Sequence, residues 1–244
     1  MHPSIVREEV RNGNLDIGRK HYVLSLLLAV EQAQHSGYDK IVAIEFGVGA
    51  GHGLLSLVQA AEYCRTTFNI NIEVYGFDSF EGLPLLWGYK DHPEIWSAGQ
   101  FIEPDIDGLI AKLPSWCHLI VGNIEETINN FTENFWQLNA KIGFVSVDVD
   151  LYHSTVFALK IFEMLPDLYL PAVPTYFDDV NILITMSKYA GEMLAISEFN
   201  KMHVLRKIEE RPNFRIDNFF VCHIFDHPMR TGEIKPAIPF EIRA

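Results

Sequence analysis

Four aspartates lie where two apolar runs of the sequence end. Asp148 and Asp150 follow the first run, and the adjacent Asp178 and Asp179 follow the second. If the two runs are neighbouring strands of a parallel sheet, all four carboxylates meet at one edge of that sheet. Carboxylates at such short range raise one another's pKa and destabilise the fold unless a hard divalent cation such as Mg²⁺ neutralises them. The spacing therefore indicates a metal site, at which a coordinated alcohol would become more acidic and a nearby carboxylate would take its proton.

Helix capping is the alternative role for the same residues. Asp150 precedes a helical pattern that starts near Tyr152, and Asp179 precedes another helical pattern. An aspartate at such a position commonly accepts hydrogen bonds from the first N–H groups of the helix. Capping alone does not explain two acidic pairs on one edge of a sheet, so we favour the metal site.

A glycine-rich turn follows a third apolar run. Glu45 is followed by Gly47, Gly49 and Gly51, and a helical pattern begins directly afterwards. Glycines allow a tight turn and a close approach of a ligand, and the start of a helix adds free N–H groups. The dinucleotide-binding spacing GxGxxG is absent in both registers. The spacing found here resembles the first motif of class I S-adenosylmethionine (SAM) methyltransferases, whose ligand carries the positive charge that suits an acid at Glu45. A glycine turn without a ligand is the alternative.

Three more residues are expected near this ligand. Asp78 stands 33 residues after Glu45, at the end of the next strand-like run, where an acid can accept hydrogen bonds from both hydroxyls of a ribose. Ser79 beside it is expected to help hold SAM, and Glu125, in the segment after Gly122, to lie near the adenine. An ordinary aspartate at a turn is the alternative for Asp78, and its pairing with the glycine turn favours the ribose role.

Strand-like and helical segments alternate along the chain and would position these residues. The expected strands are residues 40–45, 72–77, 116–121, 142–147 and 171–177. The expected helices are residues 54–64, 124–135, 154–165 and 186–200. This alternation predicts an α/β fold with a Rossmann-like, doubly wound, mainly parallel sheet that is buried on both faces. Residues 215–225 have no helical pattern after them and are expected to form an antiparallel C-terminal edge strand.

The chain is expected to form one domain over residues 1–244. Residues 82–104 combine glycine, proline and two tryptophans without periodicity, and a long loop of this kind in a compact domain is typically a lid or a binding loop. Simple packing on the surface is the alternative for this loop. Residues 1–38, with helices around residues 19–36, are expected to form an N-terminal helical cap that closes over the methyl acceptor together with the lid.

Composition and charge restrict the class of protein. The 244 residues are 48% hydrophobic, which suffices for a continuous core and excludes a mainly disordered chain. Lys and Arg number 19 against 32 Asp and Glu, and the net charge of -13 argues against nucleic acid or an anionic membrane as the main partner. Three separated cysteines support neither a disulfide framework nor a zinc site. Without a signal-peptide pattern or a membrane-spanning apolar stretch, we expect a cytoplasmic protein with a small-molecule partner; a homo-oligomer is compatible with the sequence.

Three longer stretches resemble one enzyme family. Residues 75–84 (YGFDSFEGLP), residues 147–155 (VDVDLYHST) and the FDD of residues 177–179 are similar to motifs of the macrocin-type (TylF-like) O-methyltransferases, and the likeness covers residues 41–180. Enzymes of that family depend on Mg²⁺ and methylate hydroxyl groups, often of sugars on natural products. The resemblance implies that Asp148, Asp178 and Asp179 bind the metal and that Asp150 is the general base. It implies methyl transfer from SAM to a hydroxyl of a small molecule, as in natural product biosynthesis.

The chain departs from the family pattern in three places. Gly49 and Ala50 replace a Trp-Arg pair, His153 replaces a glutamate, and the usual Gly-Gly before the fifth strand is absent. Such loop positions set substrate choice, so the differences bear on the acceptor more than on SAM. Two other classes stay open from the sequence: a nucleotide-dependent oxidoreductase on the same fold, and a non-catalytic Rossmann-like binding protein.

Overall fold

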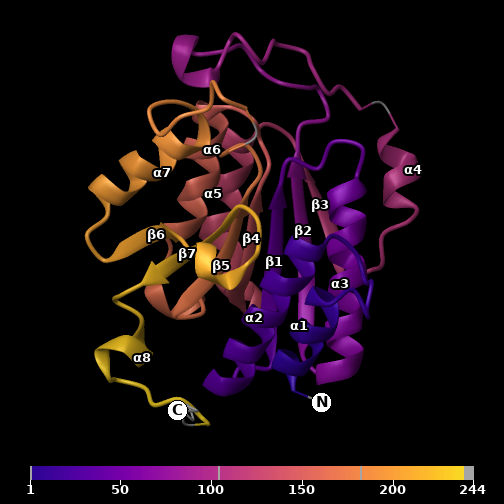
Figure 1. Ribbon diagram of the computed structural model, residues 1–244, viewed down its shortest axis with the longest axis vertical. Helices are drawn as coiled ribbons and strands as arrows, with labels where there is room; N and C mark the ends of the chain where they lie inside the picture. The colour runs from indigo at the N-terminus through magenta and orange to yellow at the C-terminus, as the bar shows by residue number, and fades with distance from the viewer. Residues whose placement is uncertain (1, 104, 182, 239–244) are drawn as a thin grey trace.

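A mixed β-sheet forms the centre of the protein in the computed structural model, which describes residues 2–103, 105–181 and 183–238 (Figure 1). Within these residues the sheet has seven strands in the order β3-β2-β1-β4-β5-β7-β6. The strands are β1 (Lys40–Phe46), β2 (Asn71–Asp78), β3 (Cys117–Val121), β4 (Lys141–Val147), β5 (Ala172–Phe177), β6 (Arg206–Glu210) and β7 (Phe219–Ile224). Strands β1 to β5 run parallel, and β7 is antiparallel to both β5 and β6. The Rossmann-like, mainly parallel α/β fold predicted from the sequence is confirmed.

Helices cover both faces of this sheet. They are α1 (Pro3–Arg11), α2 (Lys20–Ser36), α3 (His52–Phe68), α4 (Ile106–Ile110), α5 (Ile124–Asn134), α6 (Tyr152–Ala158), α7 (Gly191–Met202) and α8 (Pro228–Thr231). One buried cluster joins α1, α2 and α3 to one face, and a second joins α5, α6 and α7 to the other (Figure 1). Successive strand residues alternate between the clusters: Ala43 belongs to the first and Ile44 to the second, as in any sheet buried on both faces. In the described ranges, every helix is too short or too polar to cross a lipid bilayer.

The C-terminal region differs most from the expectation. The strand expected over residues 215–225 begins only at Phe219, because residues Pro212–Phe214 form a 3₁₀ turn (η5) and both Arg215 and Asn218 have left-handed backbones. This strand is also not the edge strand, since β7 lies between β5 and β6. The true edge strand β6 has the sequence RKIEE, in which Arg206 and Ile208 are buried. Its charges are typical of a protected sheet edge and conceal it from a search for apolar runs.

Two helices are shorter than expected. The helix expected over residues 154–165 is α6, which starts two residues earlier and passes at Leu159–Phe162 into a 3₁₀ turn (η3). The helix expected over residues 186–200 begins at Gly191, where a φ of +57° interrupts any longer helix. The other expected helices and strands end within a few residues of the observed ones. Met1, Pro104, Ile182 and residues 239–244, which belong to the expected domain, cap and lid, lie outside the described residues.

Candidate active site

The acidic residues lie in a row at the carboxyl ends of neighbouring strands. The register pairs Phe46 of β1 with Phe77 of β2 and with Val147 of β4, and Val147 in turn with Phe177 of β5. Backbone bonds extend the pairing by one residue, because the next N–H after β4 donates to β1 and the next after β5 donates to β4, at 2.9 and 3.1 Å. The acids at this level are Asp78, Asp148 and Asp178, and Glu45 lies two residues earlier along the strands, opposite Gly76 and Ser146. β1 and β4 stand where the strand order reverses, which is where α/β sheets of this type bind ligands.

The glycine turn follows β1 and is shaped by close backbone contacts. Gly47 has a φ of +86°, and a Cβ atom there would lie 1.6 Å from the carbonyl oxygen of Asp148. At Gly51, which precedes α3, a Cβ atom would lie 2.4 Å from the side chain of Leu109. Gly49 differs from both, because no atom of the described residues comes within 4 Å of its Cβ position. Gly47 and Gly51 are therefore required by packing, whereas the space at the Cβ position of Gly49 is open to a ligand.

Asp78 ties the glycine turn to the end of β2. Its Oδ2 accepts hydrogen bonds from the N–H groups of Val48 at 2.8 Å and Gly49 at 2.7 Å, and its Oδ1 accepts one from Phe80 at 2.6 Å. A carboxylate has about four acceptor positions, so about one of them remains for a ribose hydroxyl. The sequence did not reveal that Asp78 holds the glycine turn in place. Its expected contact with the ribose stays a prediction.

The other two residues expected near SAM lie at the same edge of the sheet. Ser79 is half-buried, and its hydroxyl oxygen accepts a hydrogen bond from the N–H of Glu81 at 3.2 Å. Glu125 is exposed in the first turn of α5, three residues after Gly122, whose N–H donates to the carbonyl oxygen of Asp78 at 2.9 Å. Their contacts with SAM stay predictions.

Glu45 is buried at the end of β1, against the start of α2. Its Oε1 accepts a hydrogen bond from the hydroxyl of Tyr22 at 2.6 Å, and Ser146 donates to that hydroxyl at 2.9 Å. No described residue offers a hydrogen bond to Oε2. Burial raises the pKa of Glu45 to about 8; the hydrogen bond from Tyr22 and the charge of Arg19 oppose the shift, and the charge of Asp148 adds to it. The sequence placed Tyr22 and Arg19 in the expected cap but gave no sign of their contact with Glu45.

The burial of Glu45 predicts a loss of stability as the pH rises. A carboxyl group whose pKa is raised on folding from 4.5 to about 8 stabilises the fold fully below pH 4.5 and loses this effect as the pH approaches 8. Within that window we expect Glu45 to lower the free energy of unfolding by about 1.4 kcal/mol per pH unit. Urea unfolding across the window should show a flatter pH dependence for Glu45→Gln. The exposed Glu62 on α3 provides the control, since Glu62→Gln should keep the wild-type slope; an equal slope in Glu45→Gln would contradict the shift.

Three aspartates form a carboxylate cluster at the ends of β4 and β5. Asp148, Asp178 and Asp179 each offer an oxygen atom, and these atoms lie within 4.8 Å of one another. Burial raises the pKa of Asp148 to about 7, and the charges of the other two aspartates add to the shift. Tyr176 donates a hydrogen bond to Asp178, whereas Oδ2 of Asp179 is buried with no hydrogen-bond partner in the described part of the chain. Concentrated, partly buried negative charge with an unpartnered oxygen fits a hard divalent cation.

Asp150 lies beside the carboxylate cluster without belonging to it. Its φ of +61° places it in the left-handed region, in the turn between β4 and α6. Its carboxyl group interacts with that of Asp179. Burial raises the pKa of Asp150, and the charges of Asp148 and Asp178 raise it further. A carboxylate outside the ligand set with increased proton affinity suits the role of general base.

Helix capping does not explain these carboxylates. Leu151 occupies the N-cap position of α6 and Ala190 that of α7, and no side-chain cap bond is present at either helix within the described residues. The capping alternative is therefore wrong for Asp150 and Asp179. The helix α7 instead contributes Glu192, a fully buried acid that accepts a hydrogen bond from the N–H of Asp179 at 3.0 Å. Nothing in the sequence distinguished Glu192 from other acids in helical segments.

The middle of the expected lid, residues 82–104, is held against the start of α6. Asp91, fully buried at the end of the 3₁₀ turn η1 (Gly88–Asp91), accepts a hydrogen bond from the N–H of His153 at 3.1 Å and contacts the Nδ1 of its ring at 2.8 Å. The ring of Trp87 stacks on the same imidazole, with ring centres 4.8 Å apart. His153, one of the departures from the family pattern, thus anchors the segment above the carboxyl ends of the strands (Figure 1).

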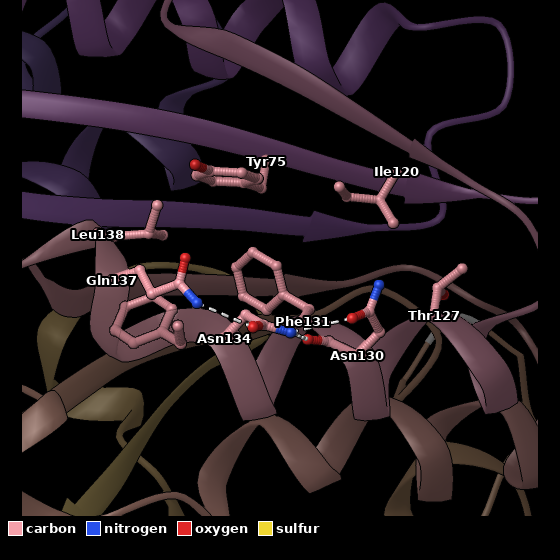
Figure 2. A pocket seen from close by; sticks show the side chains of 9 residues that line it. Tyr75, Ile120, Thr127, Asn130, Phe131, Asn134, Gln137 and Leu138 are labelled. Atoms are coloured by element: carbon pink, nitrogen blue, oxygen red, sulfur yellow. Dashed lines mark hydrogen bonds between the residues drawn. The ribbon is translucent and has the colours of Figure 1, made fainter.

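A separate hollow of about 390 Å³ lies between α5 and the strands β2 and β3 (Figure 2). Tyr75 and Ile120 form one wall, and Asn130, Phe131 and Asn134 of α5 face them. The described residues that line it include none of the acids discussed above. The hollow is therefore distinct from the candidate active site.

Comparison with known proteins agrees with this geometry. The structure is similar to that of CalS11, a calicheamicin methyltransferase, with a TM-score of 0.58 and 22% sequence identity over 90% of this chain and 86% of the other. It is also similar to the O-methyltransferase NovP, with a TM-score of 0.57 and 16% identity over 84% of this chain and 79% of the other. At these identities the two likenesses show the fold alone, and no curated protein matches the sequence. Residues 44–180, more than half of the chain, match the family described as a methyltransferase domain, and the protein belongs to that family.

Proposed function

We propose that this methyltransferase transfers a methyl group from SAM to a hydroxyl group of a small molecule, with the help of a divalent cation. The observation that carries the proposal is the carboxylate cluster of Asp148, Asp178 and Asp179 at the ligand-binding edge of a methyltransferase domain. The unpartnered Oδ2 of Asp179 supports a cation there, because an unsatisfied buried carboxylate oxygen is costly. Membership of the macrocin-type family and dependence on Mg²⁺ are part of this proposal.

In this proposal each group of residues has its own role in the reaction. The carboxylate cluster would hold the cation, which when bound makes a coordinated hydroxyl group more acidic. Asp150 accepts the proton of the acceptor hydroxyl. The acceptor oxygen forms a bond to the methyl carbon while the bond from that carbon to sulfur breaks, and S-adenosylhomocysteine leaves. The residues proposed to hold SAM are Glu45, Gly47, Gly49, Gly51, Asp78, Ser79 and Glu125.

The cap and the lid are proposed to enclose the acceptor. Within the cap of residues 1–38, Tyr22 contacts Glu45 directly, so the cap is continuous with the proposed SAM site. Within the lid of residues 82–104, Asp91 fixes the middle of the segment beside the turn that carries Asp150. We propose one domain in which both segments exclude water from the reacting groups. The resemblance to the macrocin-type family makes hydroxyl groups of natural products, including those of their sugars, the first acceptors to test, and the descriptions of CalS11 as a calicheamicin methyltransferase and of NovP as an O-methyltransferase are compatible with this choice.

Calorimetric titration with SAM, with and without Mg²⁺, tests the proposal. SAM should bind in both conditions, because the glycine turn and the carboxylate cluster are separate groups of residues. Product formation from a panel of natural-product alcohols should require the divalent cation and stop on addition of a chelator. Absence of SAM binding would favour a non-catalytic protein, and binding of NAD in its place would favour an oxidoreductase.

A further inference from the structure

Glu192 presents a buried carboxylate to the cluster from outside the sheet. The residue lies in the first turn of α7 and has no exposed surface. Its Oε2 accepts the N–H of Asp179 at 3.0 Å, whereas its Oε1 has no hydrogen-bond partner among the described residues. Glu192 and Asp179, which are joined by this hydrogen bond, therefore each have one buried carboxylate oxygen without a partner among the described residues.

The charge of Glu192 acts on the same acids that are proposed to bind the cation. It interacts with the charges of Asp179, Asp148 and Asp150. Glu192 is nevertheless absent from the group of oxygens that lie within 4.8 Å of one another, which comprises Asp148, Asp178 and Asp179. Its carboxylate therefore acts on the site through Asp179 and through its charge, without belonging to the ligand set.

The start of α7 fixes the direction of Glu192. Gly191 has a φ of +57°, and a Cβ atom there would lie 3.1 Å from the imidazole of His92 in the docked lid segment. The first position of α7 therefore favours glycine, and the side chain of the next residue, Glu192, is directed inward. The first turn of a helix also favours a negative charge, which reduces the cost of burying this carboxylate.

We propose that Glu192 is a positioning residue of the metal site, which fixes the main chain of Asp179 and supplies negative charge that a divalent cation neutralises. The inference rests on the proposed function. Hydrogen-bonded groups behind the ligands of a metal commonly change its affinity by about 10- to 100-fold. In the absence of a cation the same carboxyl group is a burden on the fold, because it is buried near other acids and one of its oxygens has no compensating partner among the described residues.

Glu192→Gln separates the charge from the shape of the side chain, because glutamine can still accept the N–H of Asp179. With Mn²⁺ as the probe in calorimetric titration, we expect the variant to bind the ion at least about tenfold more weakly than the wild type. Without divalent cations, its melting temperature should exceed that of the wild type by about 2–4 °C. SAM affinity should stay within about twofold, because Glu192 contacts the cluster and not the glycine turn.

Glu198→Gln is the matched control on the same helix. Glu198 is partly exposed and accepts a hydrogen bond from the hydroxyl of Tyr152 at 2.5 Å, away from the cluster. Its glutamine variant should bind Mn²⁺ as the wild type does and should not become more stable without the ion. Glu192→Ala removes both the charge and the hydrogen bond, and it should bind Mn²⁺ more weakly than Glu192→Gln.

The outcomes distinguish this inference from the proposed function. If the wild type binds Mn²⁺ and Glu192→Gln binds it equally well, the inference is overturned and the metal site stands. If Glu192→Gln melts below the wild type without divalent cations, Glu192 has a merely structural role and the inference is again overturned. If the wild type does not bind Mn²⁺, both the metal site of the proposed function and the inference are wrong.

Discussion

Asp148→Asn is expected to abolish binding of divalent cations and to slow methyl transfer by about three orders of magnitude, equivalent to about 4 kcal/mol of transition-state stabilisation. Asparagine keeps the shape of the side chain but lacks the negative charge that a hard cation requires. The affinity for SAM should change by less than about threefold, because the contact between this residue and the glycine turn uses the carbonyl oxygen of Asp148 and not its side chain. Cation binding is measured by Mn²⁺ titration, cofactor binding by SAM titration, and methyl transfer by initial rates with an alcohol that the wild type methylates.

Asp150→Asn is the natural comparison for that variant. Asp150 lies outside the carboxylate cluster, so its variant should retain most of the Mn²⁺ affinity. Loss of the general base should nevertheless lower the rate by about 10²- to 10⁴-fold. Equal losses of SAM binding and turnover in Asp148→Asn would show that the acids have been assigned wrongly. Loss of Mn²⁺ binding in Asp150→Asn alone would exchange the roles of the two residues.

The carboxyl edge of the sheet could be predicted from the sequence because it depends on local signals. Four of the five apolar runs expected to form parallel strands end at an acid, and parallel strands bring their ends to one edge whatever the details of packing. The register confirms that these strands end side by side, since Phe46 pairs with both Phe77 and Val147. The positions of Asp78, Asp148 and Asp178 follow directly from the strands that precede them.

The contacts between distant elements could not be predicted in the same way. Tyr22 reaches Glu45 because α2 packs across the sheet, and Glu192 reaches Asp179 because α7 begins at a particular glycine. Neither contact produces a pattern in the sequence, since each joins residues whose neighbours are ordinary for their helices. The strand β6 was missed for a related reason: its charged sequence is a property of an edge and not of an apolar core.

The glycine turn provides the second large effect, and Gly47→Ala is expected to destabilise the fold by about 3–5 kcal/mol. A Cβ atom at Gly47 would lie 1.6 Å from the carbonyl oxygen of Asp148, so the ends of β1 and β4 would have to separate. Overpacking costs about 1–3 kcal/mol and a left-handed backbone about 1–2 kcal/mol, and the very short contact puts the sum in the upper part of the combined range. Urea unfolding should show the loss directly.

Gly49 is the matched position two residues later, where substitution should act on the ligand and not on the fold. Gly49 also has a positive φ, of +49°, but no described atom lies within 4 Å of its Cβ position. Gly49→Ala should therefore cost only the left-handed backbone, about 1–2 kcal/mol, and remain folded. Gly49→Val places a larger side chain in the open space, so SAM should bind at least about tenfold more weakly, a loss of about 1.4 kcal/mol in calorimetric titration.

The pair of positions distinguishes packing from binding within a single turn. Wild-type stability in Gly47→Ala would mean that β1 and β4 do not approach each other as described. Wild-type SAM affinity in Gly49→Val would remove the glycine turn from the cofactor site, even if the carboxylate cluster binds its cation. If both expectations hold, alternate glycines of one motif serve different purposes, because one faces the backbone of β4 and the other faces the space left for SAM.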